Sequence, residues 1–310
     1  MITKVSATGM SREEWLAMRR KSIGGSDAGA LLGLNKYTSP YALWAEKTGK
    51  IVPEDISDKE AVRLGNDLEN YVAQRFMEQT GKKVRRENHF LFNDAFPFAH
   101  ALPDRMVVGE NAGLECKTTS SWEVIKKCRT GQYPDQWYAQ VMHYMMVTGA
   151  EKWYLAVLCF GHGFYVFEIE RNDDEIIALA VAERDFWHLV ETGTPPTADG
   201  TESTQEALKT IYAESSGTSC DLGAVRTALV QYEALGKQIA ELQELQNAQK
   251  ATVQLYMRDA ERGSCDGYKV RWKTQVRNTF DKKRYEKECG TIPPTYYKQS
   301  VSRPFTVTAE

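Results

Sequence analysis

The chain has 310 residues, 42% of them apolar, which is enough to bury the core of one large domain or of one domain with an appendage. A net charge of −3 argues against a uniformly basic nucleic-acid protein, so any DNA contact must come from a local group of cations. The sequence has no apolar signal segment and no run of about 18 apolar residues, and we expect a cytoplasmic protein without a membrane span.

Residues 1–80 are expected to be mainly helical, because helix-starting residues repeatedly precede apolar stretches. The expected helix starts are the capping box Ser11–Glu14, the tight turn Gly24–Asp27, the pair Ser39–Pro40 and a second capping box Ser57–Glu60, whose helix should end at Thr80 before Gly81.

Beyond residue 81 the pattern becomes extended, with glycine-rich turns that predict hairpins at 109–113 and 161–163. The expected strands are 84–92, 98–108, 114–118, 153–160 and 164–169, and the expected helices are 122–127, 134–147 and 173–191.

The carboxy-terminal third has a different composition. Residues 194–220 are rich in Thr, Ser, Gly and Pro and indicate a linker. A polar helix is expected over 224–262, with apolar residues at steps of three or four that suit a helical hairpin or a coiled coil. Short strands are expected from 268 to 305. The expected domains are therefore a core at 1–195, a linker at 196–220 and an appendage at 221–310.

The strongest chemical signal is Pro103-Asp104 followed by Glu115-Cys116-Lys117 on two expected strands joined by a turn. Side chains alternate along a strand, so residues 115 and 117 share a face, and a hairpin partner brings residue 104 alongside. Carboxylates suit Mg²⁺, the Cys116 carbonyl offers a further ligand, and a lysine orients a metal-bound water. The pattern therefore favours phosphodiester hydrolysis.

Two plainer explanations remain for this pattern. All its residue types are common, so the spacing also arises by chance, and two carboxylates with a lysine also form structural ion pairs. Pro103 inside a strand requires an edge or a bulge.

Glu69, on the helix before the strands, is either a third carboxylate of the site or an exposed helix charge. Gln140 and Trp137, on the helix after them, either face the site or belong to ordinary helix surface.

Five segments in this order resemble the YqaJ-type viral recombinase family, which is related to phage lambda exonuclease, and the resemblance covers residues 11–170. The segments are RRKSIGGSDAGALLGLNKYTSPYALWAEK, RLGNDLENYVAQRF, ALPDRMV, LECKT and YAQVMHYMMVTG. The resemblance implies an α/β fold with a restriction-endonuclease-like core of the PD-(D/E)XK class, a central mixed β-sheet flanked by helices. The helical hairpin or coiled coil and a small β appendage would follow that core.

The resemblance also implies roles for individual residues. Asp104, Glu115, Glu69 and the Cys116 carbonyl resemble the metal ligands, Lys117 the lysine that aligns the attacking water, and Gln140 the glutamine of the following motif. Arg19 and Ser26 match residues that hold a 5′-phosphate, while Trp137 stands where the family has a tyrosine.

Two further segments suit DNA by their own chemistry. Ser26 follows two glycines and opens a helix, where free N–H groups favour a phosphate and Arg19 adds a bidentate clamp; the alternative is a plain tight turn. The tail places cations, including Lys273 and Arg277, among aromatic residues, which indicates a nucleic-acid groove or a solvated basic face.

The expected function is a Mg²⁺-dependent exonuclease, with Mn²⁺ as a substitute ion and one or two ions bound. It would digest linear double-stranded DNA ends 5′→3′ and leave 3′ single strands for a single-strand annealing protein, in phage or prophage recombination. A ring-shaped homo-oligomer is a further expectation. The alternatives are a structure- or sequence-selective endonuclease of the same fold and a non-cutting module that binds DNA ends and loads a recombinase.

Overall fold

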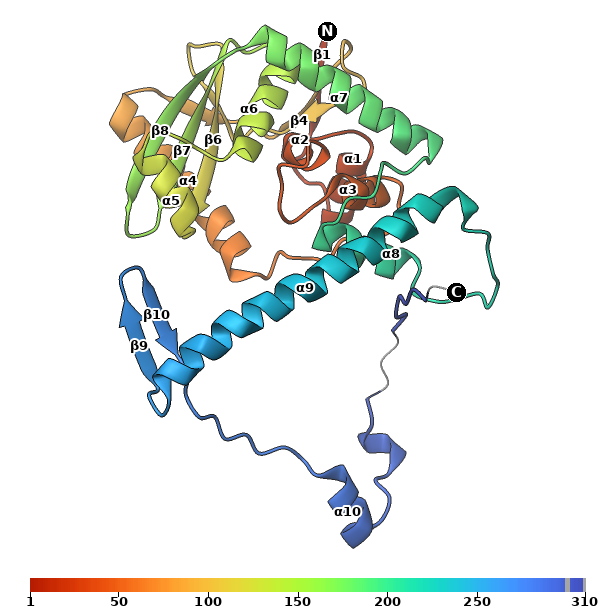
Figure 1. Cartoon of the computed structure of the whole chain (residues 1–310). Helices are drawn as coiled ribbons and strands as arrows, with labels where there is room; N and C mark the ends of the chain where they lie inside the picture. The colour runs from red at the N-terminus through yellow and green to blue at the C-terminus, as the bar shows by residue number, and fades with distance from the viewer. Residues whose placement is uncertain (299–301, 309–310) are drawn as a thin grey trace. The chain divides into compact units, whose positions relative to one another are not determined.

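The computed structural model describes residues 1–298 and 302–308, and the chain divides into two compact units, Met1–Tyr212 and Ala213–Glu310 (Figure 1). The first unit has a central mixed sheet flanked by helices, which confirms the expected fold class.

The main sheet has the order β2-β5-β6-β7-β8. β6 and β7 run parallel and are joined through α5 and α6, because parallel neighbours need a crossover connection, whereas the other pairs are antiparallel. A second sheet has the order β1-β3-β4. The strands are β1 (Ile2–Ser6), β2 (Val84–Arg86), β3 (His89–Asn93), β4 (His100–Ala101), β5 (Arg105–Val107), β6 (Ala112–Thr119), β7 (Lys152–Cys159) and β8 (Gly163–Glu170).

Both faces of the main sheet are covered, as the sequence of β7 requires. Trp153, Leu155 and Val157 enter the core that contains the apolar residues of α6, whereas Tyr154 and Ala156 enter the core that contains α4. This alternation defines an α6 face and an α4 face of the sheet. The helices are α1 (Arg12–Arg20), α2 (Gly25–Leu31), α3 (Pro40–Lys47), α4 (Glu60–Thr80), α5 (Trp122–Arg129), α6 (Asp135–Thr148), α7 (Asp173–Thr192) and α8 (Glu202–Ile211).

The helix starts test the capping predictions. Ser11 and Glu14 form the predicted capping box, and Gly81 ends α4 in the left-handed conformation. The second predicted capping box is wrong: α4 begins at Glu60 after Lys59, and no side chain caps it. Asp55 accepts the Ser57 N–H instead, which forms a turn just before the helix.

Pro103 interrupts the strand that was expected over 98–108. β4 ends at Ala101 and β5 begins at Arg105, so Pro103 lies between them. A proline has no N–H to donate to a sheet, so its position outside both strands is physically reasonable. Asp104 consequently lies immediately before β5 rather than inside a strand.

The expected linker contains a helix that packs on the first unit. Ser39 N–H donates to Ser203 Oγ at 3.0 Å, Thr204 Oγ1 lies 2.7 Å from Ser39 Oγ, and Ala207 is buried. The Thr and Ser residues read as loop formers thus cap α8 and attach it to α3. The first unit therefore extends to Tyr212 and not only to residue 195.

The second unit contains one long helix followed by a small hairpin. The long helix was expected over 224–262, with an apolar stripe suited to a helical hairpin or a coiled coil. The stripe lies on one continuous helix, which ends at Met257, before the first strand of the β hairpin. The tail, expected to be extended, contains a helix that begins where Asp281 accepts the Arg284 N–H. The elements are η1 (Gly223–Val225), α9 (Arg226–Met257), β9 (Arg262–Cys265), β10 (Tyr268–Arg271), α10 (Lys282–Cys289) and η2 (Pro294–Tyr296).

Within the described ranges, no helix is both long enough and apolar enough to cross a membrane.

Candidate active site

Three polar side chains form a closed hydrogen-bonded triangle on the α6 face of the sheet. Glu115 and Lys117 lie two residues apart on β6, and Glu115 is in register with Leu155, which faces α6. Lys117 Nζ donates to Glu115 Oε1 at 2.6 Å and to Gln140 Oε1 at 2.9 Å, and Gln140 Nε2 donates to Glu115 Oε1 at 2.8 Å. The structure therefore brings these three sequence-predicted residues together.

Asp104 joins this group through the backbone of β6. Its Oδ2 accepts the Cys116 N–H at 2.7 Å, which ties the start of β5 to the strand that carries Glu115 and Lys117. The Cys116 side chain packs in the core on the α4 face, and burial raises the pKa of its thiol well above the usual range. The thiol is thus a neutral packing group.

The electrostatics of these carboxylates suit a divalent cation. Burial, together with the charges of Glu115 and Glu69, raises the pKa of Asp104 well above its usual value. Glu115 Oε2 is buried and has no hydrogen-bond partner. Burial opposes the charged form of Lys117, but the carboxylates of Glu115 and Asp104 raise the pKa of this lysine, so it stays protonated. An unpartnered carboxylate oxygen beside a second carboxylate is a donor set that fits Mg²⁺ or a similar hard ion.

Glu69 comes from the helix on the opposite face of the sheet, and its side chain lines the same pocket as Asp104. It belongs to α4, and its side chain pairs with Arg105, which also donates to Asn70 Oδ1 at 2.7 Å. Among the residues that the structure describes, no three His, Cys, Asp or Glu side chains form a group that could hold a metal by themselves. The third carboxylate predicted for the site is therefore engaged in an ion pair at its edge.

The predicted phosphate-binding residues form a second cluster. Arg19 Nη2 donates to Ser26 Oγ at 2.7 Å, and its guanidinium lies 4.8 Å from the centre of the Trp15 ring. Asp27 accepts from the Gly24 N–H at 2.9 Å and pairs with the buried Lys47 amine at 2.6 Å. Although burial alone would raise it, Lys47 and Arg19 lower the pKa of Asp27 to about 2.

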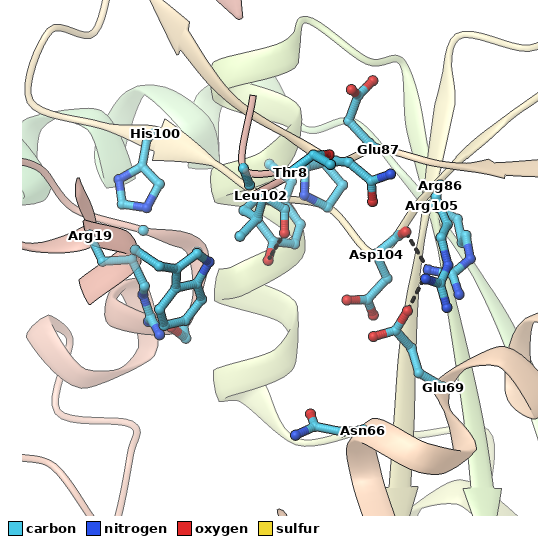
Figure 2. A pocket seen from close by; sticks show the side chains of 18 residues that line it. Thr8, Arg19, Asn66, Glu69, Arg86, Glu87, His100, Leu102, Asp104 and Arg105 are labelled. Carbon is cyan, nitrogen blue, oxygen red and sulfur yellow. Dashed lines mark hydrogen bonds and ion pairs between the residues drawn. The ribbon is translucent and has the colours of Figure 1, made fainter. Parts of the chain in front are cut away.

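One pocket of about 710 Å³ connects the two clusters. Its lining includes Arg19 and Ser26 at one side and Asp104 and Glu69 at the other. Figure 2 shows Arg19 across the pocket from the Asp104 and Glu69 side chains. Tyr144, whose hydroxyl lies 3.0 Å from Gln140 Nε2, also lines this pocket.

The predicted residues Trp137, Lys273 and Arg277 belong to neither of these two clusters. Trp137 packs against the α6-face core and lines a separate pocket of about 370 Å³. Lys273 and Arg277 belong to the second unit, where they are exposed between β10 and α10.

The sequence did not indicate several residues that contact the predicted site residues and fix their side chains. Arg105 neutralises Glu69, Tyr144 supports Gln140, and Lys47 pairs with Asp27. The one signal that could have indicated Tyr144 is its spacing of one helical turn from Gln140. No spacing rule connects Lys47 to Asp27.

The fold defines an α/β protein with the architecture of solved exonucleases. An alkaline exonuclease from Laribacter hongkongensis shares this fold with a TM-score of 0.50 and 20% identity, over 59% of this chain and 94% of that chain. The same exonuclease in complex with dAMP matches with a TM-score of 0.50 and 21% identity, over the same shares of the two chains.

Sequence comparison identifies the family. Residues 14–151 match the YqaJ-like viral recombinase domain. The uncharacterized protein YqaJ of Bacillus subtilis (strain 168) is 41% identical over 303 residues, which are 96% of this chain and 94% of that protein. The chain therefore belongs to the YqaJ-like viral recombinase family, as the resemblance implied. Because the YqaJ match extends over nearly the whole chain, the second unit is shared with this relative.

Proposed function

We propose that this protein is a divalent-metal-dependent deoxyribonuclease that digests linear double-stranded DNA from its ends in the 5′→3′ direction. The observation that carries the proposal is the triangle of Glu115, Lys117 and Gln140, next to Asp104 at the side of an open pocket. The fold shared with an alkaline exonuclease supports the same reaction class.

Asp104, Glu115 and the Cys116 carbonyl are the groups that would hold Mg²⁺, with Mn²⁺ as a substitute. When bound, such an ion lowers the pKa of water and stabilises charge on the phosphate. We assign Glu69 to the edge of this site, where it would bind a second ion or a ligand water only after leaving Arg105. The site would therefore hold one ion while Glu69 is paired with Arg105, and two ions only when Glu69 has left it.

The protein's own side chains would position the reactants. The protonated Lys117 amine orients the attacking water, and Gln140 fixes that amine between two acceptors. Hydrolysis adds water across the P–O3′ bond, so the released nucleotide keeps a 3′-hydroxyl and the shortened strand gains a 5′-phosphate. The complementary strand remains as a 3′ overhang.

Arg19 and Ser26 would bind the terminal 5′-phosphate. Ser26 stands at the second position of α2, where backbone N–H groups lack helical partners and favour an anion. Because these residues share a pocket with Asp104, one end of a nucleotide can be held at Arg19 while its other phosphate reaches the carboxylates. This arrangement supports the 5′→3′ polarity.

The decisive experiment uses two kinds of substrate. One is a linear duplex, with or without a 5′-phosphate, in which either the 5′ end or the 3′ end of one strand carries the label; the other is a covalently closed circle. Shortening of the 5′-ended strand with Mg²⁺ or Mn²⁺, an intact circle and no reaction in EDTA are the expected results. Cleavage of the circle would instead identify an endonuclease. Binding of ends without cleavage in either metal would identify a recombinase-loading module.

We also propose that the exposed apolar stripe of α9 supports self-association. Tyr232, Leu235, Ile239 and Leu242 are 54–65% exposed. With these four residues at the a and d positions of a heptad, the adjacent e and g positions are Gln231, Gly236, Gln238 and Gln243, so a second copy would meet no like charge at those positions. Light scattering of wild type and Leu235→Glu should show a larger assembly for wild type only. A wild-type monomer that gains mass only with a single-strand annealing protein would assign the stripe to that partner.

Three predicted DNA contacts complete the proposal. Trp137 would contact DNA from the smaller pocket beside the site, and Lys273 and Arg277 would contact DNA from the second unit. We place the activity in phage-type recombination within the bacterial cytoplasm.

A further inference from the structure

The β9–β10 hairpin of the second unit gathers cations on one of its faces. In this antiparallel pair Arg262 is directly opposite Arg271, and Ser264 is directly opposite Lys269. Because side chains alternate along a strand, these four residues share one face. A pocket of about 460 Å³ is lined by residues of the two strands, including all four.

The opposite face of the hairpin faces the end of α9. A side chain added at Gly263 would lie 3.8 Å from the Met257 Cε, and Met257 is one of the few buried residues of this unit. The cationic face therefore points away from that contact, toward solvent.

Two arginines directly across a hairpin cost stability, because like charges at paired positions repel. Such a pair is normally relieved by a carboxylate. Within residues 213–298, however, the ion pairs join residues of α9 or of α10, namely Lys237–Glu233, Lys282–Glu286 and Arg284–Glu288. The hairpin cations thus have no acidic partner there, although Glu261 and Asp266 flank the strands.

The positive charge continues along the chain. Residues 268–280 contain four cations and no Asp or Glu, in a protein whose net charge is −3. Exposed aromatic side chains accompany them, namely Tyr268, Trp272 and Phe280. A local concentration of cations with interleaved aromatic residues is the composition that binds a nucleic-acid backbone.

We propose that the face formed by Arg262, Lys269 and Arg271 binds the phosphate backbone of DNA, as a second DNA-binding element outside the catalytic unit. The inference rests on the proposed nuclease function, for which it names a substrate contact. A two-stranded ribbon is narrow enough to enter a duplex groove, and phosphate oxygens supply the anions that the opposed arginines lack. The tether to the first unit raises the effective concentration of substrate after each cut.

The test measures binding of a fluorescent 5′-phosphorylated duplex over a range of salt concentrations, without divalent cation, so that no cleavage occurs. The variant carries Arg262→Ala, Lys269→Ala and Arg271→Ala. The slope of log K against log salt is negative. Each lost phosphate contact reduces its magnitude by about 0.9, so three lost contacts reduce its magnitude by about 2.7.

The matched control carries Lys209→Ala, Arg226→Ala and Lys250→Ala, three exposed cations in other elements with the same change in net charge. Its slope should stay close to that of the wild type. Equal slopes for the variant and the control would overturn the proposal, because net charge alone would then account for the effect.

Two further variants separate binding from folding. Arg262→Lys with Arg271→Lys keeps the charges and should retain the wild-type salt slope; a loss as large as that of the alanine variant would overturn the backbone-contact proposal. Arg271→Thr relieves the repulsion and should leave the melting temperature unchanged or raise it, whereas a lower melting temperature would assign the arginine a structural role instead.

The substrate and the nuclease proposal are tested separately. With a single strand of the same length, the difference in slope between the wild type and the hairpin variant should be smaller, because each contact then contributes about 0.7. If the hairpin variant loses binding but wild type never cleaves, only the nuclease proposal fails. If wild type cleaves and the hairpin variant binds as well as wild type, only the hairpin proposal fails.

Discussion

The two units differ in how their positively charged side chains are buried and paired. In the first unit the Lys117 and Lys47 side chains are 22% and 2% exposed, and each contacts a specific carboxylate. In the second unit Arg262, Lys269 and Arg271 are exposed and have no recorded ion pair among the described residues. Removing one partner of a buried pair leaves an uncompensated charge in the core. An exposed cation contributes little by itself, and the combined effect of several exposed cations decreases as the salt concentration rises. Single substitutions should therefore have large effects in the first unit only.

The largest effect is expected for Lys117→Ala. The lysine is the one cation in the triangle with Glu115 and Gln140, and its loss removes the group proposed to orient the attacking water. Cleavage of linear duplex should fall by roughly 10²-fold or more, the loss expected when a reactant is no longer held in position. Gel assays of cleavage and anisotropy assays of binding on the same duplex provide the measurement.

Duplex binding by Lys117→Ala should stay close to that of the wild type, because the contact is proposed to act on water. Lys83→Ala, a change at an exposed lysine, should retain full activity. Turnover at the wild-type rate in Lys117→Ala would remove this residue from the mechanism.

The next effect concerns stability and compares a buried with an exposed ion pair. Lys47→Ala should destabilise the first unit by about 3–5 kcal/mol, because Asp27 would remain buried without its partner. Lys59→Ala, which removes the exposed pair with Glu54, should cost at most about 1 kcal/mol. Urea denaturation of both variants tests this difference, and equal losses would mean that burial does not control the strength of these pairs.

The sequence predicted those parts of the site that follow from local spacing. Glu115 and Lys117 converge because residues two apart on a strand share a face, and Asp104 is brought alongside by the hairpin of β5 and β6. For Gln140 the residues alone left the site and the helix surface open, and the resemblance favoured the site, because only the packing of α6 on the sheet brings it to Lys117.

Contacts set by helix packing could not be predicted in this way. His143 and Glu183 pair at 2.7 Å in the core, although they are far apart in sequence and on different helices. Glu69 reaches the edge of the site from α4 on the opposite face of the sheet, where it lines the same pocket as Asp104 and pairs with Arg105, a partner that no local spacing indicates. α8 was read as a linker, because Thr and Ser that cap a helix are also common in turns.

A smaller effect is expected for Arg19→Ala, because Arg19 is partly exposed and Asp27, which lies 3.8 Å from it, would keep its closer partner Lys47 at 2.6 Å. A hydrogen bond to a charged group contributes about 1.5–3 kcal/mol, so digestion of 5′-phosphorylated ends should slow about 10-fold or more. Digestion of ends without a phosphate should change little. Initial rates on the two ends measure the difference.

Arg20→Ala provides the control, since Arg20 is exposed on the same helix. It should affect both kinds of end equally and slightly. An equal loss on both ends in Arg19→Ala would argue against the phosphate pocket.

The smallest effect is a pH dependence from the buried His100 of β4, which lies on the Arg19 side of the pocket (Figure 2). Burial lowers the pKa of His100 to about 3, while an unfolded histidine titrates near 6.5. Below pH 6.5 the unfolded chain therefore binds a proton that the folded chain does not, and stability falls as the pH decreases toward 3. The slope is at most about 1.4 kcal/mol per pH unit.

His100→Asn should remove this slope between pH 6.5 and 5 while keeping an acceptor for Ser22 Oγ, which lies 2.8 Å from His100 Nδ1. In this window the Asp27 contribution is constant, because its pKa is lowered to about 2 and its stabilisation is lost only below about 3.8. The raised pKa of His143 stabilises the fold below 6.5, where its contribution is already complete. Urea denaturation at the two pH values measures the slopes, with exposed His188→Asn as the control. If His100→Asn and wild type lose stability in parallel, His100 is not the buried neutral group inferred from its surroundings.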